Sequence, residues 1–192
     1  MSLILASSSP YRQQLIQKLN LTAEIVPPDI NETIYANESA QQAAGRLSHE
    51  KAMAVALKTS GVIIASDQTA EVGRHILGKP GNVENAIKQL TMCSGQAVTF
   101  YTGLCVYNTT TNSLQQDVVP FTVVFRQLSH KEITRYVELE QPFDCAGSFK
   151  SEGLGVALFE SMSGSDPNAL IGLPLIALCN MLRNEGINPL LS

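Results

Sequence analysis

The sequence predicts an α/β protein, because strand-like apolar segments alternate with helix signals along its 192 residues. A buried-strand pattern at 3–6 is followed, after a serine loop, by a helix that opens at Pro10. A long helix at 40–58 precedes a continuous apolar run at 62–65, which is typical of a central strand buried on both faces. The third observation is a β-rich stretch over 97–125 with a polar turn in its middle, which indicates an antiparallel hairpin.

The N-terminal part is expected to supply a helix, a second strand and an acidic loop. The helix covers 10–19, where apolar residues recur along one stripe, and Asn20 can end it in the left-handed conformation. A strand follows at 22–26, and the two prolines at 27–28 end it because proline has no N–H for a strand ladder. The loop after these prolines carries Glu32.

The long helix shows a clear start signal and an unusual inner face. Ser39 and Gln42 form a capping box, in which each side chain hydrogen-bonds to the other residue's backbone N–H. The residues expected on its inner face are Ala40, Ala43, Ala44, Leu47 and Lys51. Lys51 therefore stands where an apolar residue belongs.

Further capped helices are expected around the hairpin. Asn82 caps a helix that ends near 94–95, and Ser129 with Glu132 forms a second capping box for a helix that ends before Gln141. The other expected elements are hairpin strands at 97–107 and 114–125, a glycine-containing segment at 146–155 where the backbone makes a close approach, a short strand at 156–159, a loop at 163–168, a bend at 172–174 and a closing helix at 174–185.

Composition and charge limit the classes of partner. With 44% hydrophobic residues the chain can bury a full core, and we expect a single domain over 1–192. A net charge of −4 without any basic run argues against nucleic acid polymers and membrane surfaces as partners. The four scattered cysteines form no CxxC pair and indicate reduced core residues. Since the sequence also has no export signal and no apolar run of about 18 residues, we expect a cytoplasmic protein.

The first loop is a candidate anion site. The serines at 7–9 lead into a helix whose first turn offers free N–H donors and the positive end of the helix dipole. Arg12 adds a planar fork for phosphate oxygens, and Tyr11 places an aromatic face where an attached base would lie. This pattern indicates a nucleotide or a similar phosphoester. The same serines also suit a plain helix cap, and the segment alone gives both interpretations equal weight.

Two carboxylates are candidates for catalysis or metal binding. Asp67 follows the apolar run at 62–65, which places it at the carboxyl end of that strand, where ligands gather in open α/β sheets. It suits a base or a metal ligand there, or an ordinary turn cap. Glu32 offers the second carboxylate needed to share a divalent cation, although an acidic loop is more often simply solvated.

Two lysines are candidate phosphate contacts. Lys51 interrupts an apolar stripe, and the alternative is a lysine that snorkels to the rim of the core. Lys79 lies between Gly78 and Pro80, a stiff setting that suits either a fixed phosphate contact or a simple surface turn. The three histidines share no metal-like spacing, so we expect them to be structural or surface residues.

Three cations and two carboxylates outside their expected polar faces together predict metal-assisted hydrolysis of a polyphosphate. Arg12, Lys51 and Lys79, with a divalent metal, would neutralise the charge that develops on the phosphates. A carboxylate would orient or deprotonate the attacking water. The chain lacks the GxxxxGK[ST] motif of P-loop NTPases and the GxSxG nucleophile elbow.

Seven short segments carry a family resemblance. They are LILASSSPYRQQL at 3–15, NET at 31–33, EKA at 50–52, SDQ at 66–68, GKP at 78–80, AGSFKSEGLG at 146–155 and IGLPLIAL at 171–178. In this order they resemble the Maf family of nucleotide pyrophosphatases throughout the chain, and SDQ with KSEG resembles its YceF-like branch, whose members hydrolyse 7-methyl-GTP. The resemblance implies an ITPase-like α/β fold, a twisted mixed sheet flanked by helices, with two lobes around a deep cleft.

The resemblance also implies roles for particular residues. Asp67 is the catalytic proton acceptor and, with Glu32, the metal ligand, and the phosphate contacts are Ser7, Arg12, Lys51 and Lys79. The residues that set base specificity in this branch are Tyr11, Gln68 and Glu152. A 7-methylguanine ring is positively charged, so Tyr11 would gain a cation–π interaction and Glu152 would accept hydrogen bonds from the guanine edge.

The implied cofactor is a divalent cation, Mg²⁺, Mn²⁺ or Co²⁺, and the implied partner is a nucleoside triphosphate. Some members pair as dimers, which leaves a homodimer open. Many members have arginine at the position of Tyr11, and Asn31 stands where an aspartate commonly precedes the glutamate. The alternatives are a pyrophosphatase for dTTP, UTP or a broad set of nucleotides, and a non-catalytic nucleotide-binding regulator of cell division.

Overall fold

The strands form one mixed seven-stranded sheet. The computed structural model describes residues 2–191. Its strands are β1 (Leu3–Ala6), β2 (Glu24–Ile25), β3 (Val62–Val72), β4 (His75–Leu77), β5 (Ala97–Asn108), β6 (Ser113–Phe125) and β7 (Phe159–Gly164). Their order is β2-β1-β3-β5-β6-β7, with β4 paired to β3 off this path. β1 is parallel to both of its neighbours and the other pairs are antiparallel.

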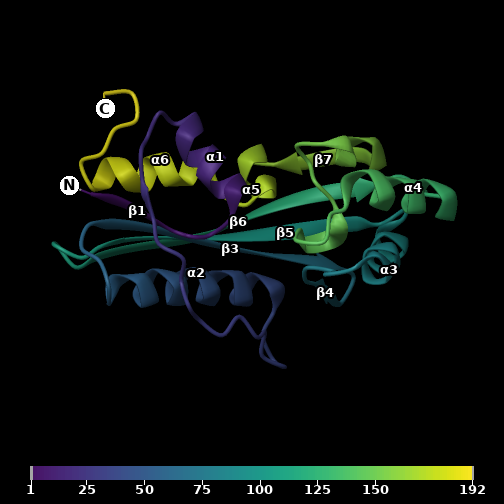
Figure 1. The fold of residues 1–192 in the computed structure, drawn as a ribbon, viewed down its shortest axis with the longest axis horizontal. Coiled ribbons are helices and arrows are strands. Elements are labelled where there is room, and N and C mark those ends of the chain that lie inside the picture. The colour runs from purple at the N-terminus through teal and green to yellow at the C-terminus, as the bar shows by residue number, and fades with distance from the viewer. Residues whose placement is uncertain (1, 192) are drawn as a thin grey trace.

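Helices cover both faces of the sheet, which confirms the predicted fold class. They are α1 (Pro10–Lys18), α2 (Ala40–Ala56), α3 (Val83–Cys93), α4 (His130–Glu140), α5 (Pro167–Ile171) and α6 (Leu175–Asn184), with 3₁₀ turns η1 (Ala146–Ser148) and η2 (Leu154–Leu158). Figure 1 shows α2 on one face and α1 with α6 on the other, while α3 and α4 lie at the end of the sheet far from the chain termini. Among residues 2–191 no helix is long and apolar enough to cross a membrane.

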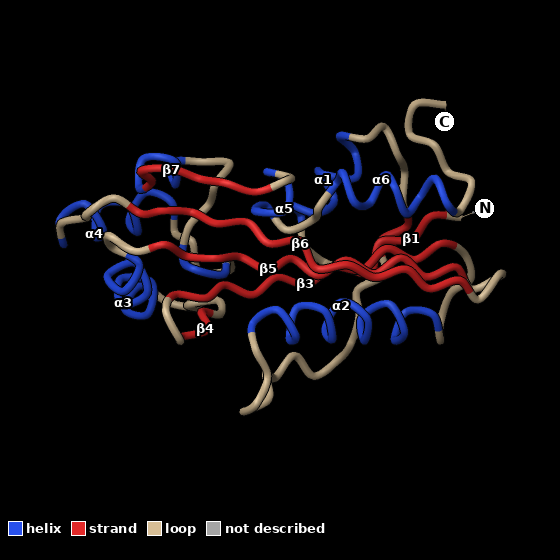
Figure 2. The backbone as a smooth tube through the Cα atoms, turned by 180° about the vertical axis from the view of Figure 1, so that it is seen from behind, coloured by secondary structure: helices blue, strands red, loops and turns tan. Residues whose placement is uncertain are grey.

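The core is divided between two halves that share the long strands β3, β5 and β6 (Figure 2). In the half near the termini, one apolar cluster includes Leu5 and Leu178 on the α1 and α6 side, and another includes Val55 on the α2 side. In the other half, a cluster that includes Phe100 and Leu90 joins the sheet to α3 and α4. Each fully buried side chain of this size contributes about 1.5–3 kcal/mol, so each half has its own source of stability.

The helix starts follow the caps that the sequence predicts. Ser39 and Gln42 make both hydrogen bonds of a capping box at α2, as do Ser129 and Glu132 at α4. Asn82 caps α3 by accepting from the backbone N–H of Asn85. Asn20 has a φ of 56° just after α1, which confirms the predicted left-handed ending.

The prediction for the segment after the glycine-rich stretch is wrong in two places. Of the strand expected at 156–159, residues 156–158 belong to the 3₁₀ turn η2 and only Phe159 is in a strand, β7, which then runs through the first part of the expected loop at 163–168. β7 is an exposed edge strand and therefore shows no apolar alternation. The helix α5 was also missed, although Asp166 caps it and Pro167 opens it.

The predicted place of Asp67 at the end of a strand is also wrong. β3 continues to Val72 because it pairs with β5 along its whole length, from Val62 opposite Asn108 to Val72 opposite Val98. Asp67 nevertheless lies beyond the carboxyl end of the parallel neighbour β1, whose last residue, Ala6, is opposite Ala65. The β2 strand is likewise shorter than the expected 22–26.

Candidate active site

One cavity of about 510 Å³ brings all the predicted site residues together. Its lining includes Ser7, Tyr11, Arg12, Glu32, Lys51, Asp67, Gln68, Lys79 and Glu152. These residues come from segments of both halves of the fold, with the β1–α1 loop and α2 on one side and the loops after β4 and η1 on the other. The cavity therefore lies between the two halves, where a cleft was expected.

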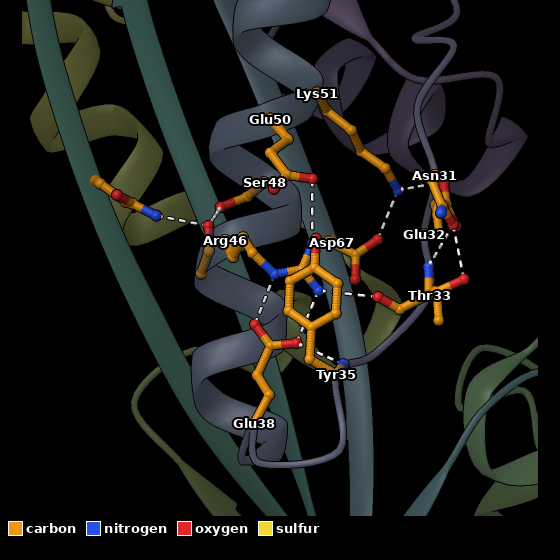
Figure 3. Close-up of polar contacts among 12 residues, drawn as sticks. Asn31, Glu32, Thr33, Tyr35, Glu38, Arg46, Ser48, Glu50, Lys51 and Asp67 are labelled. Atoms are coloured by element: carbon orange, nitrogen blue, oxygen red, sulfur yellow. Dashed lines mark hydrogen bonds and ion pairs between the residues drawn. The ribbon is translucent and has the colours of Figure 1, made fainter.

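Lys51 occupies the centre of an ion-pair cluster in the cavity wall. Its Nζ lies 2.5 Å from Oδ1 of Asp67 and 2.8 Å from Oε1 of Glu32. The Lys51 side chain is 6% exposed and that of Asp67 is 10% exposed, whereas that of Glu32 is 51% exposed. Figure 3 shows Lys51 reaching from α2 toward Asp67 on β3 and toward the loop that carries Glu32. Lys51 does not snorkel to solvent.

The environment of Glu32 favours its ionised form. Burial raises the pKa of this carboxyl, but the hydrogen bond and charge of Lys51, together with the charges of Lys79 and Arg12, outweigh burial and lower the pKa overall. The sequence left open that Glu32 is simply solvated. The Glu32 side chain is in fact half-exposed, but its carboxylate is paired with Lys51.

The two carboxylates form a donor set that suits a divalent cation. Oxygens of Glu32 and Asp67 both contact the Lys51 ammonium group, so the two carboxylates face the same point of the cavity wall. Mg²⁺ is often held by one or two carboxylates together with substrate phosphates. Among the described residues, no group of three or more histidines, cysteines or acidic residues is placed to bind a metal. A metal held by these two carboxylates would therefore complete its coordination with water or with phosphate oxygens.

Arg12 is fixed at the cavity by the connection between α5 and α6. Its Nε donates to the carbonyl of Gly172 at 2.8 Å and its Nη1 donates to Oγ of Ser7 at 3.3 Å. Burial lowers the pKa of Arg12, and the charges of Asp67 and Glu32 act in the opposite direction. Since arginine has a very high reference pKa, the group stays cationic.

The serine loop caps α1, as one of the two interpretations of the sequence predicts, and it also lines the cavity, while its binding of an anion stays a prediction. Ser9 caps α1 by accepting from the backbone N–H of Arg12 at 3.5 Å. The hydroxyl of Ser7 is buried and accepts from the backbone N–H of Ser9 at 3.1 Å. Ser7 therefore organises the loop at the helix end while lining the cavity.

The segment 169–172 supports the site and was not identified as part of it from the sequence. The carbonyl of Gly172 accepts from Ser66 Oγ at 2.9 Å in addition to Arg12. The Nε2 group of Gln68 donates to the carbonyls of Ala169 and Leu170 at 2.8 and 3.1 Å. Gln68 thus ties this segment to β3. The sequence signal for this segment was the predicted bend at 172–174. In the structure Gly172 has a φ of 123°, which favours glycine.

Tyr11 and Glu152 line another part of the cavity together with Asp144 and Cys145, which the sequence did not single out. Burial, followed by the influence of Cys145 and Asp144, raises the pKa of Tyr11, so its hydroxyl stays protonated. Burial likewise raises the pKa of Cys145 to about 12, which keeps the thiol inert as a nucleophile. The Cys145 thiol donates to Oδ1 of Asp144 at 3.5 Å.

The loop that carries Glu152 is anchored on α4. The backbone N–H of Lys150 donates to the Tyr136 hydroxyl at 2.9 Å, and the Lys150 ammonium donates to the carbonyl of Glu140 at 2.8 Å. A Cβ at Gly155 would lie 2.2 Å from the carbonyl oxygen of Lys150, which confirms the predicted close backbone approach. The backbone of the loop that carries Glu152 is therefore held in place against α4.

The chain shares its fold and its family with known proteins. The structure shares its fold with the Ham1 protein of Staphylococcus aureus, with a TM-score of 0.54 at 12% identity over 96% of this chain and 100% of that one. A model for Maf-like proteins matches residues 2–185, so the chain belongs to the Maf family.

Two curated relatives, both named 7-methyl-GTP pyrophosphatase, align along almost the whole chain. The relative from Idiomarina loihiensis is 56% identical over 191 residues, which are 98% of this chain and 96% of the relative. The relative from Pseudoalteromonas atlantica is 54% identical over 188 residues, which are 98% of this chain and 97% of the relative.

Proposed function

We propose that this protein is a nucleoside triphosphate pyrophosphatase that hydrolyses 7-methyl-GTP to 7-methyl-GMP and pyrophosphate. The observation that carries the proposal is the buried Lys51 held between Asp67 and Glu32 in the wall of a cavity that also contains Arg12 and Lys79. The names of the relatives at 54–56% identity support the substrate.

In this proposal, the side chains divide the work of hydrolysis. An oxygen of Asp67 accepts a proton from water as that water attacks the α-phosphorus, and the bond from this phosphorus to the α–β bridging oxygen breaks, so pyrophosphate leaves. Arg12, Lys51 and Lys79 bind the phosphates and neutralise the charge that develops on them. A divalent cation, Mg²⁺, Mn²⁺ or Co²⁺, held by Glu32 and Asp67 would supply further charge neutralisation on the polyphosphate.

We assign base recognition to the part of the cavity that Tyr11 and Glu152 line. Tyr11 offers an aromatic face to a positively charged 7-methylguanine ring, and Glu152 accepts hydrogen bonds from its edge. The Nε2 group of Gln68 is already bound to backbone carbonyls, so we assign Gln68 a role in shaping the base pocket through the segment 169–172.

A panel of triphosphates tests the proposed function. The purified protein is incubated with 7-methyl-GTP, GTP, UTP and dTTP, each with Mg²⁺, Mn²⁺ or Co²⁺, and the released pyrophosphate is measured. We expect the highest kcat/KM with 7-methyl-GTP and no release after chelation of the metal. Equal kcat/KM values for UTP and 7-methyl-GTP would contradict the base specificity, and binding without release from any triphosphate would indicate a nucleotide-binding regulator.

Replacing Glu152 with glutamine tests base recognition separately from catalysis. The amide keeps an acceptor but removes the negative charge, which attracts the positively charged 7-methylguanine ring more than the neutral guanine of GTP. We therefore expect the preference for 7-methyl-GTP over GTP to fall about tenfold, since a charged partner strengthens a hydrogen bond by about 1–1.5 kcal/mol. Hydrolysis of UTP should change little. Glu160→Gln, at an exposed position that does not line the cavity, is the matched control. An equal loss for every triphosphate would instead place Glu152 among the catalytic residues.

A further inference from the structure

The loop that carries Glu32 has little structure of its own. It connects β2 to α2 and contains neither helix nor strand between residues 26 and 39. Within it, the side chain of Asn31 accepts hydrogen bonds from the backbone N–H and the hydroxyl of Thr33, and Tyr35 pairs with Glu38. These contacts are local and do not fix the loop relative to α2.

Arg46 on α2 supplies that connection (Figure 3). Its Nε donates to one carboxylate oxygen of Glu38 at 2.6 Å, and its Nη2 donates to the other at 2.7 Å. The same Nη2 donates to the backbone carbonyl of Thr33 at 3.1 Å. The guanidinium carbon lies 4.2 Å from the centre of the Tyr35 ring. One side chain thus holds the loop at three successive places after Glu32.

The helix fixes Arg46 itself. Its Nη1 donates to Glu50, one turn further along α2, at 3.1 Å. The side chains of Arg46 and Glu38 are 19% and 9% exposed, so the bidentate pair is partly shielded from water. Its hydrogen bond lowers the pKa of Glu38. Such paired and shielded forks are more rigid than a single surface ion pair.

Lys51 completes a two-point attachment from the same helix. Arg46 fixes the residues just after Glu32, and Lys51 fixes the Glu32 carboxylate itself. Both side chains project from α2, which packs on β3 beside Asp67. The loop, and with it Glu32, is therefore held at a fixed position relative to the Asp67 carboxylate.

We infer that Arg46 is a positioning residue that holds Glu32 ready to bind a divalent cation together with Asp67. This inference rests on the proposed function, in which these two carboxylates bind the cation. Preorganising a ligand reduces the ordering cost of binding, and residues that support metal ligands typically change metal affinity by about 10–100-fold when replaced. Arg46 acts through the adjacent backbone, so we expect an effect at the lower end of this range.

Mn²⁺ binding to the 192-residue chain without nucleotide tests the inference. Free Mn²⁺ is measured by electron paramagnetic resonance during titration of wild type, Arg46→Met and Arg46→Lys. We expect about tenfold weaker binding for Arg46→Met and a smaller loss for Arg46→Lys, because lysine keeps one ion pair but lacks the planar fork. Arg135→Met removes an exposed arginine from an ion pair on α4 and should leave Mn²⁺ affinity unchanged.

Hydrogen exchange gives a readout that does not depend on metal or activity. The backbone amides of Thr33, Tyr35 and Glu38 are hydrogen-bonded within the loop and should exchange about tenfold faster in Arg46→Met, while the amides of α2 remain protected. Protection of α2 also shows that the variant is folded. The preference among triphosphates should not change, because Arg46 does not line the cavity.

The outcomes separate the inference from the proposed function. Wild-type Mn²⁺ affinity and wild-type loop exchange in Arg46→Met would overturn the inference, even if the wild-type protein is an active pyrophosphatase. Weaker Mn²⁺ binding with faster loop exchange would support it, even if no triphosphate proves to be a substrate and the proposed function fails.

Discussion

Asp67→Asn is expected to lower kcat/KM for 7-methyl-GTP hydrolysis by about 10²–10⁴-fold, the range typical of a positioned general base. Asparagine has nearly the same shape and can still accept a hydrogen bond from Lys51, whose Nζ lies 2.5 Å from Oδ1 of Asp67. It cannot take a proton from the attacking water. The rate of pyrophosphate release at saturating and limiting substrate measures the effect.

Nucleotide binding should survive this substitution, since the phosphate contacts proposed for Arg12 and Lys79 do not depend on Asp67. The affinity of the Asp67→Asn variant for the α,β-methylene analogue of 7-methyl-GTP, measured by calorimetry without metal, should stay within about threefold of wild type, because the lost interaction belongs to the transition state. Asp117→Asn, on the exposed part of β6, is the matched control and should retain full activity. Near-normal turnover by Asp67→Asn would remove Asp67 from the proposed role.

Lys51→Met is expected to have the second largest effect on activity. It removes a buried cation that is proposed to contact the phosphates, while a side chain only one atom shorter fills most of the same space, so kcat/KM should fall by about 10²–10³-fold, as when one preorganised charge-stabilising donor is lost. Titration with the methylene analogue should also show weaker binding, in contrast to Asp67→Asn. Unchanged kcat/KM together with unchanged nucleotide affinity would mean that Lys51 serves only the fold.

The same variant carries a stability prediction with a defined pH dependence. Breaking a fully buried ion pair costs about 3–5 kcal/mol, and because Glu32 is half-exposed we expect about 2 kcal/mol here. Lys51 lowers the pKa of Glu32, so the stabilisation is present above the unfolded-state pKa of about 4.3 and is lost as pH falls through the lower folded-state pKa. Urea unfolding should therefore show a difference between wild type and Lys51→Met near neutral pH that shrinks in acid. A difference that grows in acid would contradict this assignment.

The sequence predicted local features of the fold well because local chemistry determines them. The capping boxes at Ser39 and Ser129 satisfy backbone groups within the same helix, and each helix begins where its cap predicts. Lys51 was found because a cation breaks an apolar stripe on the inner face of a helix. This break in the pattern pointed to the site because the buried Lys51 pairs there with Asp67 and Glu32.

Features that depend on contacts between distant segments were not predictable from one sequence. Asp67 lies within a strand because of its pairing with β5, which no local signal near residue 67 reveals. The carbonyl of Gly172 fixes Arg12 across 160 positions of the chain, and backbone acceptors leave no mark on residue type. Arg46 reads as an ordinary polar residue on α2 until the loop after Glu32 is placed against it.

A crystal structure with Mn²⁺ and the α,β-methylene analogue of 7-methyl-GTP tests most directly whether these side chains surround one triphosphate. We expect an anomalous peak for Mn²⁺ in contact with Glu32 and Asp67, phosphates in contact with Arg12, Lys51 and Lys79, and the base beside Tyr11 and Glu152. A nucleotide bound outside this cavity, or a peak in contact with neither carboxylate, would contradict this expectation.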